Sequence, residues 1–259
     1  MLRHLLSVWG EVERRIHRAD RLALFTDFDG TLAPIRGKPE MVRLAPRSRH
    51  RLSAIAGKGV TVGIVSGRDI SDIQTKVAVR GIWYVGAHGY FVRRSGRPPL
   101  DLLTPAQKAQ MVEVFARLAH DLRAVPGILL ESKTATVAVH YRHGSRRDRA
   151  IALASIRALL KSYPRMRLLC GKKVWELLPA SRVNKWTAIH RLLAAERRSR
   201  GERWLVFYLG DDSTDEMVFA KIKGISVVIG KRRSSTAGFF LDSTAEVQAF
   251  LAKFQATVG

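Results

Sequence analysis

The 259-residue sequence contains one cysteine, Cys170, and no long apolar run. A single cysteine excludes an internal disulfide framework and a cysteine-based zinc site, and it fits a reducing cytoplasm. We expect Cys170 itself to fill space in a hydrophobic core. Because no apolar stretch approaches the roughly 18 residues that a membrane-spanning helix needs, we expect no contact with a membrane. The leucines near the N-terminus lead into charged residues without a small-residue cleavage site, which predicts a short helix and not a signal peptide.

Acidic residues are scarce, since 22 aspartates and glutamates stand against 45 lysines and arginines and give a net charge of +23. Such an excess favours anionic partners, namely phosphorylated metabolites, nucleic acid or a membrane surface. The basic residues occur in scattered short runs without interleaved aromatic side chains, and no zinc-finger or RNA-recognition signature is present. We therefore expect solvated basic faces and a small anionic substrate, with no dedicated binding of nucleic acid.

The clearest local pattern is an apolar segment, residues 22–26, that runs into Asp27-Phe28-Asp29-Gly30. The apolar run predicts a buried strand, and the glycine lets the chain turn sharply after the two aspartates. An ordinary strand end with an Asx turn is the simpler alternative. A calcium loop would need more oxygen ligands, which residues 32–35 do not offer. An aspartate at such a strand end can also act as a nucleophile that forms an aspartyl-phosphate.

Three further polar motifs follow in the chain. A second apolar run leads into Ser66-Gly67-Arg68, whose hydroxyl and backbone N–H groups suit a phosphate. Lys185 lies far downstream, and a third apolar run leads into Gly210-Asp211-Asp212-Ser213-Thr214-Asp215. The aspartates of this last motif could instead cap the helix that follows them.

Strands and helices alternate at both ends of the chain, which predicts an α/β fold with a Rossmann-like core, a parallel sheet and helices on both faces. The predicted strands are residues 22–26, 60–65, 82–85, 205–209 and 225–229, and the predicted helices are residues 45–57, 69–77, 215–221 and 246–254, with a further helix around Trp186, Ile189 and Leu193. Ligands bind such sheets at the carboxyl ends of the strands, where Asp27, Ser66 and Asp211 would meet.

The middle of the chain has a different pattern. Residues 93–99 have the composition of a linker, and Thr104-Pro105-Ala106-Gln107 is a capping box that opens a helix. The remaining predicted elements are strands at residues 128–133 and 134–142, a helix at 147–162, and strands at 167–171 and 173–178. We predict a core formed by residues 1–100 and 179–259, and a small α+β domain of order αββαββ inserted as residues 101–178.

One face of the inserted sheet is polar. In Val137-Ala138-Val139-His140-Tyr141-Arg142, a period of two puts the valines on one face and His140 and Arg142 on the other. Glu131 and Lys133 share a face, and Lys172 and Glu176 lie close to the same strand pair. Such a face could simply be solvated, or it could cover an active site.

Taken in order, the four motifs resemble those of the haloacid dehalogenase superfamily of phosphatases, over most of the chain. The surrounding residues are similar to those of one family within it, the trehalose-6-phosphate phosphatases. The segments that carry this similarity are residues 27–35, 65–68, 131–133, 139–142, 171–179 and 210–216. The sequence departs from the family pattern at Ala87, where the family commonly has asparagine.

The resemblance implies hydrolysis of trehalose 6-phosphate to trehalose and phosphate through an aspartyl-phosphate. Asp27 would be the nucleophile, Asp29 the general acid and base, and Ser66 and Lys185 would hold the phosphoryl oxygens. Magnesium fits as a hard cation with oxygen ligands, and the resemblance assigns it Asp27, Asp211 and the backbone carbonyl of Asp29. The side chains of Asp212 and Asp215 would not bind the metal directly; they would orient the metal site or Lys185.

The resemblance also assigns the substrate contacts. In the core they are Gly30, Thr31, Gly67 and Arg68, and in the inserted cap domain they are Glu131, Lys133, His140, Arg142, Lys172 and Glu176. The alternatives are a phosphatase for another sugar phosphate, such as glucosyl-3-phosphoglycerate or sucrose phosphate, and a basic protein that binds nucleic acid or polyphosphate through a degenerate fold of this kind. We expect a cytoplasmic monomer.

Overall fold

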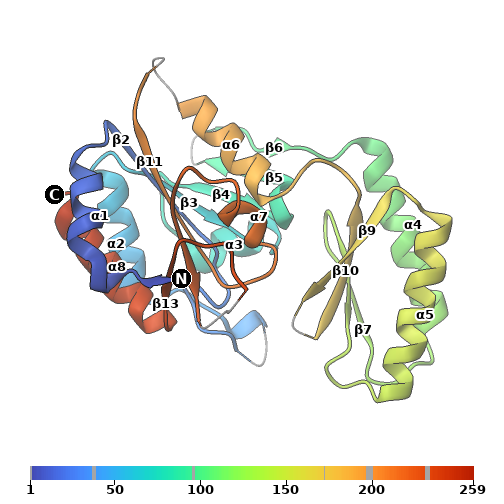
Figure 1. Cartoon of the computed structure of the whole chain (residues 1–259). Coiled ribbons are helices and arrows are strands. Elements are labelled where there is room, and N and C mark those ends of the chain that lie inside the picture. Colours follow the sequence, from blue (N-terminus) through green and yellow to red (C-terminus); the bar gives the residue numbers. More distant parts are fainter. Residues whose placement is uncertain (1, 37–38, 95–96, 172, 197–200, 231–233) are drawn as a thin grey trace. The chain divides into compact units, whose positions relative to one another are not determined.

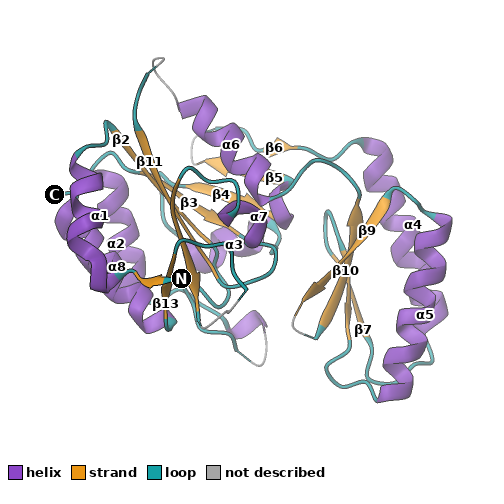
Figure 2. Ribbon diagram, viewed as in Figure 1, coloured by secondary structure: helices purple, strands orange, loops and turns teal. Residues whose placement is uncertain are grey.

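A computed structural model describes the chain except residues 1, 37–38, 95–96, 172, 197–200 and 231–233 (Figure 1). The chain divides into two compact units. The first unit consists of Met1–Leu100 and Val183–Gly259, and the second is the continuous segment Asp101–Arg182. Both units combine helices with strands (Figure 2). The predicted α/β class is confirmed.

The first unit is built on a sheet that, among the described residues, has nine strands in the order β1-β13-β12-β11-β2-β3-β4-β5-β6. The strands are β1 (Arg3–His4), β2 (Arg21–Thr26), β3 (Thr61–Val65), β4 (Trp83–Gly86), β5 (Phe91–Arg94), β6 (Leu100–Asp101), β11 (Trp204–Gly210), β12 (Gly224–Ile229) and β13 (Phe239–Leu241). In this spatial order, each pair of neighbouring strands from β1 through β13, β12, β11, β2 and β3 to β4 is parallel, and β5 is antiparallel to β4. The carboxyl ends of β2, β3 and β11 therefore lie at one edge of the sheet.

Helices cover both faces of this sheet because its strands are apolar on both sides. They are α1 (Trp9–His17), α2 (Pro46–Gly57), α3 (Ile70–Val77), α6 (Lys185–Glu196), α7 (Glu216–Phe219) and α8 (Thr244–Thr257), with short 3-10 helices η1 (Leu6–Val8), η2 (Pro39–Met41) and η3 (Ala87–Gly89). In β2, Leu24 packs into the core that includes α1, α2, α3 and α8, whereas Phe25 packs into the core of α6 and α7. This alternation is the period of two expected of a strand.

The second unit contains a four-stranded antiparallel sheet in the order β7-β8-β10-β9 and two helices on one of its faces (Figure 2). Its elements are α4 (Pro105–Leu122), β7 (Leu129–Ser132), β8 (Val137–His140), α5 (Arg146–Ser162), β9 (Met166–Gly171) and β10 (Val174–Pro179). The predicted capping box of α4 is present, since Thr104 and Gln107 bond reciprocally. Val137 and Val139 belong to the core beneath the helices, as the alternation predicts.

Three expectations were wrong. Cys170 is exposed and does not fill the core, because it lies near the end of β9, at the edge of the sheet. Part of the predicted linker at residues 93–99 belongs to β5, which pairs with β4. Helix α7 is shorter than predicted and begins after Asp215, whose side chain has other partners.

The very short strand β1 was not predicted, because two residues carry no periodicity and its partner, β13, lies more than 200 residues away in the sequence. Among the described helices, none combines the length and the apolar character needed to cross a membrane.

Candidate active site

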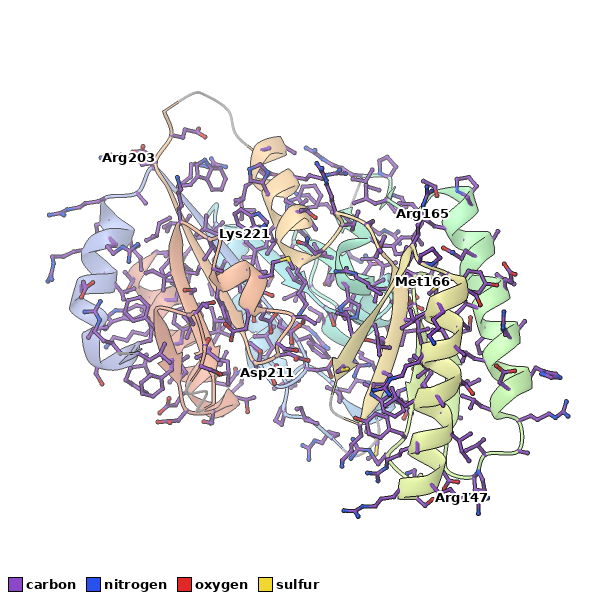
Figure 3. The ribbon with its side chains drawn as sticks, turned by 45° about the vertical axis from the view of Figure 1, so that its right-hand side comes forward. Arg147, Arg165, Met166, Arg203, Asp211 and Lys221 are labelled. Atoms are coloured by element: carbon purple, nitrogen blue, oxygen red, sulfur yellow. The ribbon has the colours of Figure 1, made fainter. Side chains whose placement is uncertain are left out.

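Three polar residues follow directly on parallel strands of the first unit. Asp27 follows β2, Ser66 follows β3 and Asp211 follows β11, and the backbone N–H groups of Asp27 and Ser66 still bond the neighbouring strands, to Leu209 and Val85, at 2.8 Å each. Asp211 is labelled in Figure 3. The sheet thus continues to the functional side chains, which gives them a rigid base at the edge where α/β sheets bind ligands.

The turn after Asp27 brings the chain against Asp211. Gly30 has a φ of +85°, and a Cβ added there would overlap the Asp211 carboxylate. The buried Thr31 hydroxyl donates to Asp211 Oδ1 at 3.4 Å. Gly30 and Thr31, which sequence reasoning assigned to the substrate, therefore pack directly against this aspartate.

Lys185 connects Asp27 with the last motif. This lysine begins α6, and its Nζ donates to Asp27 Oδ1 at 2.9 Å and to Asp215 Oδ1 at 2.7 Å. All three side chains are buried, and Lys185 is only 4% exposed. A buried charge requires paired groups around it, and here the pairing fixes the lysine beside the proposed nucleophile.

Asp215 is itself held from two further sides. Tyr208 donates its hydroxyl to Asp215 Oδ1 at 2.6 Å, and the backbone N–H of Asp212 donates to Asp215 Oδ2 at 2.9 Å. The side chain of Asp212 bonds the backbone N–H and hydroxyl of Ser213 instead. Sequence reasoning missed Tyr208, because a tyrosine within an apolar strand carries no motif signal.

Burial and charge shift the acidity of this cluster. Burial raises the pKa of Asp27 well above its ordinary value, and Asp215 and Asp211 add to this effect while Lys185 opposes it. Burial lowers the pKa of Lys185, but the carboxylates of Asp215 and Asp27 outweigh it and leave the pKa raised. The lysine is therefore a permanent cation at neutral pH, beside carboxylates that repel one another.

Asp27, Asp211 and Asp215 can place one carboxylate oxygen each within 4.8 Å of one another. Three clustered acidic groups against one lysine leave an excess of negative charge, which a hard cation would neutralise. Asp215 already accepts hydrogen bonds from Lys185, Tyr208 and the backbone N–H of Asp212. The side chains best suited to hold a metal are therefore Asp27 and Asp211. A second group, His4, Asp242 and Glu246, also meets this distance criterion, but His4 and Glu246 already pair at 2.9 Å.

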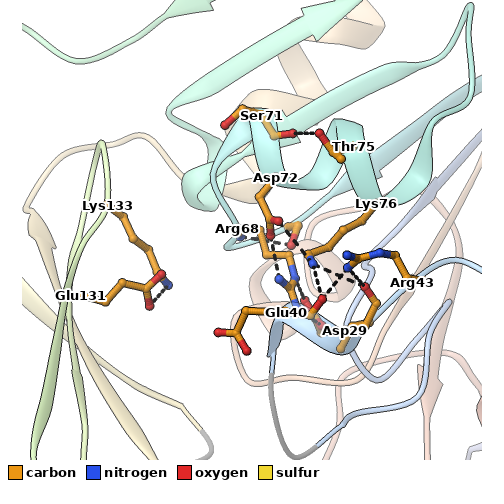
Figure 4. A network of polar contacts seen from close by, with 12 residues as sticks. Asp29, Glu40, Arg43, Arg68, Ser71, Asp72, Thr75, Lys76, Glu131 and Lys133 are labelled. Atoms are coloured by element: carbon orange, nitrogen blue, oxygen red, sulfur yellow. Dashed lines mark hydrogen bonds and ion pairs between the residues drawn. The ribbon is translucent and has the colours of Figure 1, made fainter.

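Asp29 lies in a separate network of ion pairs (Figure 4). Arg68 Nε and Nη2 donate to its two oxygens at 2.5 and 2.8 Å, and Arg68 Nη1 donates to Asp72 Oδ2 at 2.7 Å. The backbone N–H of Arg68 donates to the Ser66 hydroxyl oxygen at 3.2 Å. Arg68 was expected to contact substrate, and in the structure its guanidinium bonds the two aspartates.

Gly67 lies against the ring of His88, which a Cβ at this glycine would approach to 2.6 Å. His88 and Ala87 both have positive φ angles, of 57° and 46°, and the His88 N–H bonds the carbonyl of Ser66 at 3.1 Å. Ala87, where the sequence departs from the family pattern, is thus in a left-handed conformation that asparagine adopts more readily.

In the second unit, four of the expected substrate residues form one polar cluster on the sheet. Lys133 Nζ donates to Glu176 Oε1 at 2.6 Å and lies 3.9 Å from Glu131, and His140 Nε2 lies 2.8 Å from Glu131 Oε2. The hydrogen bond with His140 lowers the pKa of Glu131; burial opposes this effect and Lys133 supports it. Ala138 pairs with both glutamates in the sheet, so its small side chain leaves them side by side.

Arg142, also expected to bind substrate, is exposed and lies beyond the end of β8, in a bend, outside this cluster. Lys172, the remaining expected residue, lies outside the described residues.

The sequence pattern of the trehalose-phosphatase family matches residues 25–245 of the chain. The chain is 32% identical over 238 residues to the trehalose-phosphate phosphatase of Mycolicibacterium paratuberculosis. This match covers 88% of this chain and 60% of that protein. It is 31% identical over 262 residues to the probable trehalose-phosphate phosphatase 2 of Oryza sativa subsp. japonica, covering 91% of this chain and 68% of that protein. The chain thus spans less than two thirds of the length of its mycobacterial relative.

Among solved structures, the fold is similar to that of the C-terminal domain of Candida albicans trehalose-6-phosphate phosphatase. The TM-score is 0.84 at 19% sequence identity, and the match covers 99% of this chain and 98% of the other. A trehalose-6-phosphate phosphatase of Aspergillus fumigatus gives a TM-score of 0.72 at 23% identity, over 99% of this chain and all of the other. At these identities the likeness establishes the fold.

Proposed function

The chain belongs to the trehalose-phosphatase family, and from this membership we propose that it is a magnesium-dependent phosphatase that hydrolyses trehalose 6-phosphate to trehalose and phosphate. The observation that carries the proposal is the buried Lys185, held at 2.9 Å from Asp27 at the carboxyl edge of the sheet. A cation fixed beside a nucleophilic carboxylate is what an attack on a phosphate dianion requires.

Magnesium is the proposed cofactor, held by side-chain oxygens of Asp27 and Asp211 and by the backbone carbonyl of Asp29. The fit rests on the donor set, because Mg²⁺ takes oxygen ligands and the cluster of three buried aspartates has an excess of negative charge. When bound, the ion would neutralise charge on the phosphoryl oxygens.

In the first proposed step, a carboxylate oxygen of Asp27 forms a bond to phosphorus as the bond from phosphorus to the sugar oxygen breaks. Asp29 gives a proton to the departing oxygen. Lys185 and the Ser66 hydroxyl stabilise the charge on the phosphoryl oxygens, and Asp215 keeps Lys185 in position.

In the second proposed step, a water molecule attacks the phosphorus of the aspartyl-phosphate. Asp29, now a carboxylate, takes the proton of this water, and the bond between Asp27 and phosphorus breaks. The products are inorganic phosphate and the regenerated Asp27 carboxylate, and Asp29 is again protonated for the next cycle.

The polar cluster of the second unit is the proposed recognition site for the sugar hydroxyls. Glu131, Lys133, His140 and Glu176 supply charged donors and acceptors on one sheet face, with Arg142 and Lys172 as further candidates. Such groups reject substrates that lack matching hydroxyls, because the polar side chains would then be left unpaired. We further propose a cytoplasmic location, which the single cysteine supports, and a monomeric enzyme.

The test is phosphate release from a panel that contains trehalose 6-phosphate, sucrose 6-phosphate, glucosyl-3-phosphoglycerate and glucose 6-phosphate. We expect the highest kcat/KM for trehalose 6-phosphate, loss of activity in a chelator and recovery with added Mg²⁺. No release from any sugar phosphate would refute the proposed reaction, and a preference for another sugar would refute the substrate.

The variant Asp27→Asn tests the nucleophile in the same assay. An amide is a poor nucleophile and a weak magnesium ligand, so we expect turnover to fall below about one thousandth of wild type while the circular dichroism spectrum stays unchanged. Turnover near the wild-type level would remove Asp27 from the mechanism.

A further inference from the structure

The network that holds Asp29 extends along α3 to a buried lysine (Figure 4). Arg68 joins Asp29 to Asp72, and Asp72 Oδ1 lies 3.4 Å from Lys76 Nζ, one helical turn further on. We call Asp29, Arg68, Asp72 and Lys76 the acid-positioning network. No strand-end motif of the sequence includes Asp72 or Lys76.

Lys76 is only 4% exposed, which is rare for a lysine and requires partners for its charge. Besides Asp72, its Nζ donates to the backbone carbonyls of Glu40 at 3.2 Å and Val42 at 3.4 Å. Its own carbonyl accepts from the N–H of Leu44 at 3.4 Å. The lysine thus fastens residues 40–44 to α3 through both its side chain and its backbone.

These contacts fasten one loop at two places. The chain leaves β2 through Asp29, whose side chain is tied to α3 by Arg68 and Asp72. It returns at residues 40–44, which Lys76 ties to the same helix and whose Val42 and Leu44 are 3% and 2% exposed. A carboxyl group held in this way has little freedom to rotate or shift.

Resting on the proposed function, we propose that Asp72 and Lys76 are positioning residues for the general acid Asp29. They act through Arg68 and the loop, and they contact no reacting atom. A carboxyl group has about four lone-pair sites, so two bonds from Arg68 leave sites at which Asp29 can carry and transfer a proton. Misplacing a catalytic group by about 1 Å can cost on the order of a hundredfold in rate.

The leaving group of the substrate separates this role from a merely structural one. A sugar oxygen is a poor leaving group that needs a proton as it departs, whereas 4-nitrophenolate leaves without one. Because kcat/KM compares the transition state with free enzyme and substrate, it reports the first phosphoryl transfer for both substrates. A misplaced acid therefore lowers kcat/KM for the sugar phosphate and largely spares the aryl phosphate.

The experiment compares wild type, Lys76→Met and Asp72→Asn on trehalose 6-phosphate and on 4-nitrophenyl phosphate at saturating Mg²⁺. For each variant we expect kcat/KM to fall about tenfold to a hundredfold on the sugar phosphate and less than about threefold on the aryl phosphate. Lys76→Arg, which keeps the charge, should recover most of the loss. Asp72 is 42% exposed in its side chain, so Asp72→Asn tests the same idea if Lys76→Met fails to fold.

Lys58→Met is the matched control, because Lys58 also donates to a backbone carbonyl, that of Gln255 at 2.9 Å, but is exposed and outside the network. It should leave both substrates unaffected. Equal losses on the two substrates, or no loss on either, would overturn the positioning role alone. A wild-type enzyme that hydrolyses neither substrate would overturn the proposed function and the inference with it.

Discussion

At the scale of single residues, Gly30 fits closely against Asp211. Its φ of +85° is a conformation that residues with a Cβ rarely adopt, and an added Cβ would overlap the Asp211 carboxylate. Gly59 has nearly the same φ, +83°, but nothing within 4 Å of the position of its Cβ. An alanine would therefore meet the same backbone strain at both positions, which differ in what surrounds the added Cβ.

We expect Gly30→Ala to abolish most activity, because Asp211 must move, and to destabilise the fold more than Gly59→Ala does. The strain of a left-handed alanine costs each variant on the order of 1 kcal/mol. Phosphate release and urea unfolding of both variants check this prediction. If the Gly30→Ala variant were as active as the Gly59→Ala variant, the close contact between residue 30 and Asp211 would not matter for activity.

At the scale of elements, the sheet β7-β8-β10-β9 presents Glu131 and Glu176 beside Ala138. We expect Glu176→Ala to lower kcat/KM for trehalose 6-phosphate about tenfold to a hundredfold, the effect of losing one or two polar contacts. Hydrolysis of 4-nitrophenyl phosphate should change far less. Glu113→Ala, on the exposed face of α4 in the same unit, is the control and should change neither. Equal losses on both substrates would argue against sugar recognition by this face.

The amino ends of β2 and β11 are joined by a reciprocal pair. Arg203, labelled in Figure 3, donates to Asp20 through its backbone N–H at 2.9 Å and through Nη2 at 2.8 Å, and Asp20 donates its N–H to the Arg203 carbonyl at 3.0 Å. Hydrogen bonds from Arg203 lower the pKa of Asp20 from 3.8 to about 2. A lowered pKa stabilises the fold above pH 3.8, and this stabilisation is lost as the pH falls towards 2.

We therefore expect Asp20→Asn to unfold at a lower temperature than wild type at pH 6, and the difference to shrink between pH 4 and pH 2 as the wild-type carboxylate is protonated. Thermal unfolding followed by circular dichroism at several pH values measures this difference. A gap that stays constant over that range would show that the charge of Asp20 does not matter.

Elements and motifs differed in how far the sequence could predict them. Long apolar runs such as residues 205–209 predicted strands, and the aspartates after them marked the strand ends, because burial and turn chemistry are local. The contacts of Tyr208 and Lys76 could not be predicted, since each residue has ordinary spacing within its strand or helix. Lys76 bonds the carbonyls of Glu40 and Val42, far away in the sequence, and Tyr208 reaches Asp215 across the turn after β11, so only the fold brings these groups together. The two partners of Asp72, in contrast, lie four residues before and after it along the chain.

At the scale of the whole molecule, the net charge of +23 should assist capture of an anionic substrate. Salt screens long-range attraction, so raising the ionic strength from about 0.05 to 0.5 M should lower kcat/KM several-fold while kcat changes by less than about twofold. Steady-state kinetics at saturating Mg²⁺ test this prediction. If kcat/KM does not change with salt, the positive charge of the arginines does not contribute to substrate capture.

The second unit is one uninterrupted stretch, Asp101–Arg182, while every strand end that carries an aspartate of the proposed chemistry lies in the other unit. In the gene, such a stretch corresponds to a single cassette of codons that one recombination event can exchange. On the proposed division of roles, a lineage can thus acquire a new substrate by replacing the cassette, while selection keeps the bond-breaking machinery unchanged.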